Sequence, residues 1–150
     1  MNEKEEFFKL LKYSNKLKQN KKSLRKEAPE IFKLLLKFLV RISDNFHYSE
    51  KQAYIELAKD FLSDQITADD FSYGFMGIYE EIGTKLGQMK RDESLKLANF
   101  LNPNRPEIGD LLARIYGSCD SFNPDPEIAM SNEKELKECA QILLSELQEE

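Results

Sequence analysis

Residues 67–89 read TADDFSYGFMGIYEEIGTKLGQM, and their spacing predicts one long helix. Apolar side chains recur every three or four positions for about five turns, as on a helix with one buried face. They are Phe71, Phe75, Ile78, Ile82, Leu86 and Met89. Thr67 is expected to start the helix, because a hydroxyl group and the nearby carboxylates of Asp69 and Asp70 suit a positively polarised helix end.

Four glycines interrupt this pattern, at positions 74, 77, 83 and 87. Each glycine costs up to about 1 kcal/mol relative to alanine inside a helix. Either neighbouring helices approach this segment closely, therefore, or the segment bends near Gly83.

Amphipathic patterns on both sides predict further helical segments. We expect them over about 3–20, from Pro29 through Phe46, from Ser49 to Leu62, over 92–103, from Pro106 to Gly117, and from Ser131 or Asn132 onward. Ser49 and Gln52 have the spacing of a reciprocal cap, and Gly117 is expected to end its helix by adopting a positive φ. Because the chain has one Val and two Thr and no alternating strand pattern, the expected fold class is an all-α antiparallel helix bundle.

The length of 150 residues, with 41% hydrophobic and 33% charged residues, predicts a single helical domain over residues 1–150. Charge is distributed unevenly along it. Residues 1–26 carry about +6, whereas residues 27–150 carry about −11. An acidic body attracts basic proteins and repels nucleic acid, so the expected partner is a basic protein. For the basic N-terminal helix, a solvated face is favoured over a phosphate-binding one.

The residues that could support catalysis are few. His47 is the one histidine, and its position among aromatic residues at a helix end favours a packing or capping role. Cys119 and Cys139 lack the spacing and number of ligands for zinc, and they indicate reduced thiols. We therefore predict a non-enzyme that needs no cofactor or metal. Its expected location is the cytoplasm or an equivalent reducing compartment such as an organelle stroma.

No export signal or membrane span is expected from the sequence. Met1 is followed by a polar, acidic stretch instead of an apolar leader. The most apolar run, residues 31–42, is interrupted by three basic residues and is shorter than the roughly 20 residues that a membrane helix needs.

The stretch 119–127, CDSFNPDPE, is the long irregular segment of the chain. Pro124 and Pro126 fix their own φ angles and restrict the residues before them, so the loop should be stiff. Asp120, Asp125 and Glu127 would then form a fixed acidic cluster at one end of the bundle. An equally favoured interpretation is a connector in which Asp and Asn side chains cap helices.

Several motifs, in this order, resemble the bacterial self-protective colicin-like immunity family, of the colicin D type. They are ITADDF at residues 66–71, LARIY at 112–116, DSF at 120–122, DPE at 125–127 and EKEL at 133–136. The resemblance covers about residues 54–148. It implies an immunity-like helix bundle over residues 49–150, with an N-terminal helical extension over residues 1–48. The chain also carries an insert near residues 85–105 relative to the family.

The resemblance also implies a function. Proteins of this family inhibit a tRNA-cleaving toxin nuclease by placing an acidic surface in its basic substrate cleft. The partner-binding residues expected on this chain are Asp120, Asp125 and Glu127, followed by Glu80 and Glu81. This expectation agrees with the acidic body of the chain.

A second functional hypothesis uses the extension. The helix at residues 3–20 has its own apolar stripe, which includes Phe7, Leu11 and Leu17, and a charge opposite to that of the body. It could dock the chain onto a larger multiprotein complex as an accessory subunit or assembly factor. Burial of Phe7, Leu11 and Leu17 against the rest of the chain would weaken this hypothesis, and a projecting helix would strengthen it.

Overall fold

A computed structural model describes residues 2–102, 108–125, 127 and 131–148. These residues are helical apart from short connections, so the predicted all-α class is confirmed. The elements are α1 (Glu3–Gln19), α2 (Leu24–Glu27), α3 (Pro29–Ser49), α4 (Lys51–Leu62), α5 (Ala68–Asp92), the 3-10 helix η1 (Ser94–Phe100), α6 (Ile108–Asp120) and α7 (Glu133–Leu147). The expected helix start at Pro106 and Glu107 lies outside the described residues.

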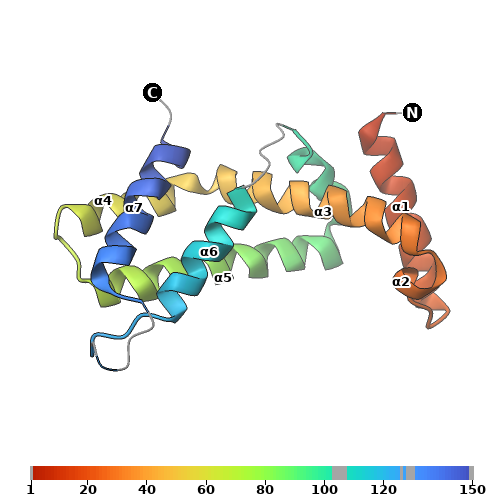
Figure 1. Cartoon of the computed structure of the whole chain (residues 1–150). Coiled ribbons are helices and arrows are strands. Elements are labelled where there is room, and N and C mark those ends of the chain that lie inside the picture. Colours follow the sequence, from red (N-terminus) through yellow and green to blue (C-terminus); the bar gives the residue numbers. More distant parts are fainter. Residues whose placement is uncertain (1, 103–107, 126, 128–130, 149–150) are drawn as a thin grey trace.

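The two longest helices, α3 and α5, run side by side along an elongated molecule (Figure 1). Helices α6 and α7 cross them toward one end, where α4 continues the direction of α3. At the other end α1 and α2 pack against the beginning of α3. No helix in the described part of the chain has the length and hydropathy required to cross a membrane.

The buried side chains in the described part of the chain form two clusters. The larger one is built from the C-terminal end of α3 together with α4, α5, α6 and α7. The smaller one is built from α1, α2, the first part of α3 and η1. Leu86 and Met89 of α5 pack against both clusters, so α3 and α5 join the two halves of the molecule.

Helix α1 uses its apolar face inside the chain. Phe7 is fully buried and Leu11 nearly so, whereas Leu17 is partly buried. Glu3 forms an ion pair with Arg41 of α3, with 2.6 Å between their charged atoms, and the Arg41 guanidinium lies 5.4 Å from the centre of the Phe38 ring. The apolar stripe of α1 is therefore largely covered by its own chain.

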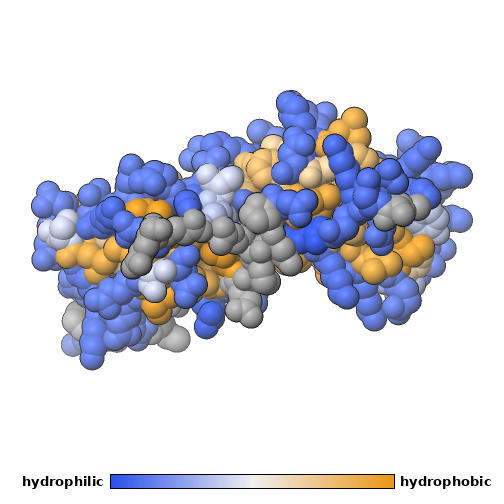
Figure 2. Space-filling model, turned by 90° about the horizontal axis from the view of Figure 1, so that it is seen from above, coloured by the Kyte–Doolittle hydropathy of each residue, from blue (hydrophilic) through white to orange (hydrophobic). Residues whose placement is uncertain are grey.

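The surface seen from above is mostly hydrophilic, and its larger hydrophobic areas lie toward the α1–α2 end (Figure 2). Among the described residues, most of the exposed large apolar side chains lie in the half of the molecule that is built on the smaller cluster. These are Tyr13, Leu34, Leu36, Val40 and Leu95.

The predicted cap at Ser49 and Gln52 is wrong. Ser49 is the last residue of α3, and its hydroxyl donates a hydrogen bond back to the Phe46 carbonyl oxygen. Glu50 alone separates α3 from α4, and its side chain makes no capping bond. The local motif fails because α3 continues for one more turn than its apolar pattern indicates.

The predicted helix end at Gly117 is also wrong, since α6 continues to Asp120 and no described glycine has a positive φ. Side chains from outside the helix bind the carbonyl groups of its last turn. Ser72 of α5 donates to the Cys119 carbonyl oxygen at 2.7 Å, and Ser131 donates to that of Ser118. These bonds make a glycine cap unnecessary.

The glycines differ in how closely other atoms approach the position of a Cβ atom. A Cβ atom at Gly74 would lie 2.9 Å from a Leu57 methyl carbon, so the close approach predicted for α5 occurs there. Nothing lies within 4 Å of the corresponding point at Gly83. At Gly109 of α6 a Cβ atom would lie 2.2 Å from a carboxylate oxygen of the buried Asp44. The contact at Gly109 is therefore the tightest of these.

We expect Gly109→Ala and Gly83→Ala to change stability in opposite directions. Alanine at 109 forces Asp44 or α6 to move and should lower the free energy of unfolding by about 1–3 kcal/mol. Alanine at 83 enters open space within a helix and should raise it by up to about 1 kcal/mol. Urea unfolding of both variants measures this, and a stabilising Gly109→Ala would contradict the packing of α3 against α6.

Candidate partner-binding surface

A hollow of about 640 Å³ lies at the end of the molecule where three segments meet. They are the α4–α5 turn with the first turn of α5, the beginning of the α6–α7 loop, and the start of α7. The lining residues are 64–70, 122–124, 132 and 133. We call this the acidic hollow, because Asp64, Asp69, Asp70 and Glu133 line it and no Lys or Arg is among its described lining residues.

The end of α4 places Asp64 at the edge of the acidic hollow. The Gln65 N–H donates to the Asp60 carbonyl oxygen at 2.8 Å, and the Asp64 N–H donates to that of Phe61 at 3.1 Å. This is the Schellman arrangement, and it puts Asp64 in the left-handed region with φ of 62°. Aspartate is one of the few residues besides glycine that tolerate this conformation.

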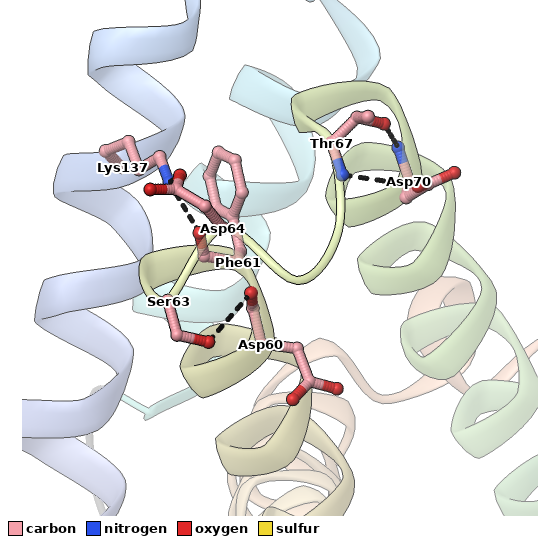
Figure 3. Close-up of polar contacts among 7 residues, drawn as sticks. All are labelled: Asp60, Phe61, Ser63, Asp64, Thr67, Asp70 and Lys137. Atoms are coloured by element: carbon pink, nitrogen blue, oxygen red, sulfur yellow. Dashed lines mark hydrogen bonds and ion pairs between the residues drawn. The ribbon is translucent and has the colours of Figure 1, made fainter.

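Two helices begin at the acidic hollow. Thr67 caps α5: its hydroxyl oxygen accepts the Asp70 N–H at 3.1 Å, while the Asp70 carboxylate accepts the Thr67 N–H at 3.2 Å (Figure 3). The predicted start of this helix is thus confirmed. Asn132 caps α7 by accepting the Glu135 N–H at 2.9 Å. Carboxylates in the first turns of both helices are favoured by the positive helix ends.

Lys137 of α7 reaches the edge of the acidic hollow from outside its lining. Its ammonium group lies 2.8 Å from the Asp64 carboxylate and also donates to the Phe61 carbonyl oxygen (Figure 3). It stands 4.1 Å from the centre of the Phe61 ring. Lys137 therefore joins α7 to the end of α4 and compensates the charge of Asp64, whereas the other three acids have no ion pair among the described residues.

The predicted loop residues Asp125 and Glu127 are exposed beside the acidic hollow, whose lining includes Asn123 and Pro124. The Asp125 N–H donates to the Asn123 side-chain oxygen at 2.9 Å, and the Glu127 N–H donates to the Asp125 carboxylate at 3.0 Å. Local side-chain bonds thus hold this loop in shape. Pro126, the second proline of the stiff-loop prediction, lies outside the described residues.

Asp120 does not lie in the loop but is the last residue of α6, because that helix continues past Gly117. The Tyr116 hydroxyl, one turn earlier, donates a hydrogen bond to the Glu80 carboxylate of α5. This bond, partial burial and the charges of Glu80 and Asp120 together raise the pKa of Tyr116. Asp120 and Glu80 therefore share one patch on the α5–α6 surface. Glu81 is paired with Lys85 at 3.6 Å.

The sequence did not identify Asp64, Asp69, Asp70 and Glu133 as a group. Thr67, Asp69 and Asp70 were interpretable as a helix start, and Asn132 as another. What joins them is the packing of α4 against both α5 and α7, which brings residues about 65 positions apart to one hollow. The sequence does indicate two capped helix starts with acidic first turns. It does not indicate that they lie close together, because their proximity depends on the tertiary structure.

His47 is buried away from the acidic hollow. Its Nδ1 atom lies 2.9 Å from the Tyr54 hydroxyl oxygen, and its ring stacks on Tyr79 at 4.9 Å between centroids. Burial lowers the pKa of His47 to about 4 and raises that of Tyr54. A neutral imidazole in a packed aromatic cluster agrees with the structural role predicted for it.

The two cysteines are free thiols. Burial raises the pKa of Cys119 to about 12 and also raises that of the half-buried Cys139, so both favour the unreactive protonated form at neutral pH. Within the described residues, no three histidine, cysteine or acidic side chains come together to form a metal site.

Comparison of the chain with protein-family models, with curated proteins and with solved structures finds no match.

His47 should make the protein sensitive to acid. Its pKa is lower in the folded than in the unfolded chain, so the unfolded chain binds more protons between about pH 6.5 and 4. Stability from this residue is present above that window and is lost as the pH falls through it, by roughly 1–3 kcal/mol. We expect His47→Gln to show a weaker loss of unfolding free energy between pH 7 and pH 5, measured by urea unfolding; an unchanged slope would contradict the neutral, buried imidazole.

Neutralising the three predicted acids should leave the fold intact. Asn at 125 keeps an oxygen for the Glu127 N–H, and Asp120 and Glu127 are exposed. We expect the triple variant Asp120→Asn, Asp125→Asn, Glu127→Gln to lose about 0.5 kcal/mol per site in urea unfolding. Asp125→Ala, which removes the acceptor, should cost about 1 kcal/mol by itself. A loss above roughly 3 kcal/mol in the triple variant would show that these acids are structural.

Proposed function

We propose that this chain is a non-catalytic, acidic binding protein that acts as an immunity-type inhibitor. In this proposal its acidic end enters the basic substrate cleft of a tRNA-cleaving, colicin-like nuclease. The observation that carries the proposal is the acidic hollow. Carboxylates from two segments that are distant in the sequence, residues 64–70 and the start of α7, converge in it, and Asp69, Asp70 and Glu133 have no ion pair among the described residues.

Electrostatics favours a basic partner at this end. Asn123 and Asn132 also line the hollow; the side-chain oxygen of each already accepts one backbone N–H and keeps a second lone pair for an N–H group of an arginine or lysine. Asp125 and Glu127 add negative charge on the adjoining loop. A cleft that binds the phosphate groups of RNA carries positive charge and N–H donors, which complement the carboxylates of the hollow.

The distribution of charge supports an oriented encounter. Helices α1 and α2, which belong to the basic N-terminal part of the sequence, lie at one end, and the segments that line the acidic hollow lie at the other (Figure 1). Such a charge dipole turns the acidic end toward a basic cleft during diffusion, which raises the association rate.

The alternative, docking onto a larger complex through the N-terminal helix, has less support. Burial of the apolar stripe of α1 weakens it, and Phe7 and Leu11 are buried within the smaller cluster. We therefore do not favour α1 as the docking element.

The proposal predicts that the protein inhibits tRNA cleavage by a colicin D-type nuclease domain at near-equal concentration. Asp69→Asn with Glu133→Gln removes two charges from the hollow while leaving the Thr67–Asp70 cap. Charges desolvated against a partner contribute roughly 2–5 kcal/mol each when truncated, so the dissociation constant should rise at least tenfold. The measurements are the inhibition constant and the association rate at several salt concentrations, and the rate should fall with salt.

A matched control is Glu138→Gln with Glu146→Gln, which removes two exposed charges of α7 outside the hollow. It should change the affinity by less than twofold. Lysozyme, a basic protein without a tRNA-binding cleft, should bind much more weakly than the nuclease domain. Equal losses in both pairs, or no inhibition, would reject the proposed site.

A further inference from the structure

A second hollow, of about 760 Å³, lies at the opposite end of the molecule. It is bounded by the end of α1, by α2, by the first half of α3 and by the C-terminal end of α5. Its described lining is formed by Leu11, Ser14, Asn15, Lys18, Lys22, Ser23, Leu24, Arg25, Phe32, Leu35, Leu36, Leu39, Gly87, Lys90, Arg91 and Ser94. We call it the basic groove.

The floor of the basic groove is apolar. Phe32, Leu35, Leu36 and Leu39 follow one another along α3 at the spacing of a helical stripe. Leu36 is 45% exposed, so the groove is open to solvent at this point. An apolar stripe of about two turns is the length over which a partner helix places its anchor side chains.

The rim is basic on two sides. Lys18, Lys22 and Arg25 come from the α1–α2 region, and Lys90 and Arg91 come from the end of α5. None of the five forms an ion pair with a described residue, and the described lining contains no acidic side chain.

Helix dipoles explain part of this arrangement but not all of it. Lys18, Arg25, Lys90 and Arg91 lie in the last turns of their helices, where cations are favoured. The dipoles do not explain why no carboxylate pairs with them, in a chain with 27 acidic residues. The dipoles also do not explain why Leu36 is exposed between these basic residues.

We propose that the basic groove binds an acidic amphipathic helix of a partner protein. The apolar side of such a helix fits the α3 stripe, and its acidic flanks reach the cations on both sides. A ligand with one anionic head and one acyl chain would satisfy only one side of the rim. RNA would use the cations but would leave the leucines in contact with phosphate and water, with Phe32 as the one aromatic ring in the described lining for stacking.

This inference is independent of the acidic hollow. It assigns the second end of the molecule a partner of opposite charge, so one chain can bring together a basic and an acidic protein.

The test uses the full chain and a fluorescent 18-residue peptide with Leu at i, i+3, i+4 and i+7 and Glu at its flanks. A scrambled peptide of identical composition keeps the charge but loses the stripe. We expect the striped peptide to bind at least tenfold more tightly by fluorescence anisotropy. Palmitate, anionic lipid vesicles and single-stranded RNA should not displace it at the same concentration.

Paired variants locate the site. Leu36→Ser should weaken striped-peptide binding at least fivefold, whereas Val40→Ser, an exposed apolar residue one turn farther along α3 and outside the lining, should change it by less than twofold. Lys90→Gln with Arg91→Gln should also weaken it at least fivefold. The control for charge is Lys9→Gln with Lys37→Gln, at exposed positions outside the groove.

Circular dichroism and thermal unfolding confirm that each variant is folded before binding is compared. A preference below tenfold for the striped peptide, equal effects of a variant and its control, or displacement by lipid or RNA would each overturn the proposal.

Discussion

Three polar side chains buried near the end of α3 hold the elements of this fold together. The Asp44 carboxylate accepts the Gly109 N–H at the start of α6, and the Asn45 amide donates to the Phe100 carbonyl oxygen of η1 at 2.6 Å. His47 bonds Tyr54 of α4. A buried polar group without a partner costs roughly 1–3 kcal/mol, so each of these contacts fixes the position of one neighbouring element. The α3 helix therefore determines the arrangement of helices from both halves of the chain.

This arrangement also positions the two candidate surfaces. The larger cluster packs α4 against α7 and α5, which brings the acidic segments to one end. The smaller cluster packs α1, α2 and η1 onto the first part of α3 and leaves the groove beside the end of α5. Because each surface is built on a different cluster, a change of side chains on one surface is expected to leave the other intact.

Helical periodicity was the part of the structure that the sequence predicted best, since the buried stripe of α5 and the caps at Thr67 and Asn132 depend on nearby residues. The error at Ser49 arose because α3 continues past its apolar pattern, and the error at Gly117 has a different origin. There side chains from outside the helix bind the last carbonyl groups of α6, as Ser72 binds the Cys119 carbonyl 47 residues away, and local motifs do not reveal such bonds. The acidic hollow was missed for the same reason. Asp120, Asp125 and Glu127 were selected because they are close in sequence, whereas Asp64 and Glu133 line one hollow only because of the packing of α4 and α7.

The signs of the charges at the two ends agree with the direction of helix α5. Helix α5 has 25 residues and is about 37 Å long, and it lines the acidic hollow with Asp69 and Asp70 and the basic groove with Lys90 and Arg91. Its dipole favours acids at the first end and cations at the second. The N-terminus of α7 adds to the first end, and the C-termini of α1 and α2 add to the second. The helix dipoles therefore favour acidic residues at helix starts and basic residues at helix ends. The topology brings several helix starts together at the acidic hollow and several helix ends together at the basic groove. A partner at either end must match a charge that the fold itself stabilises.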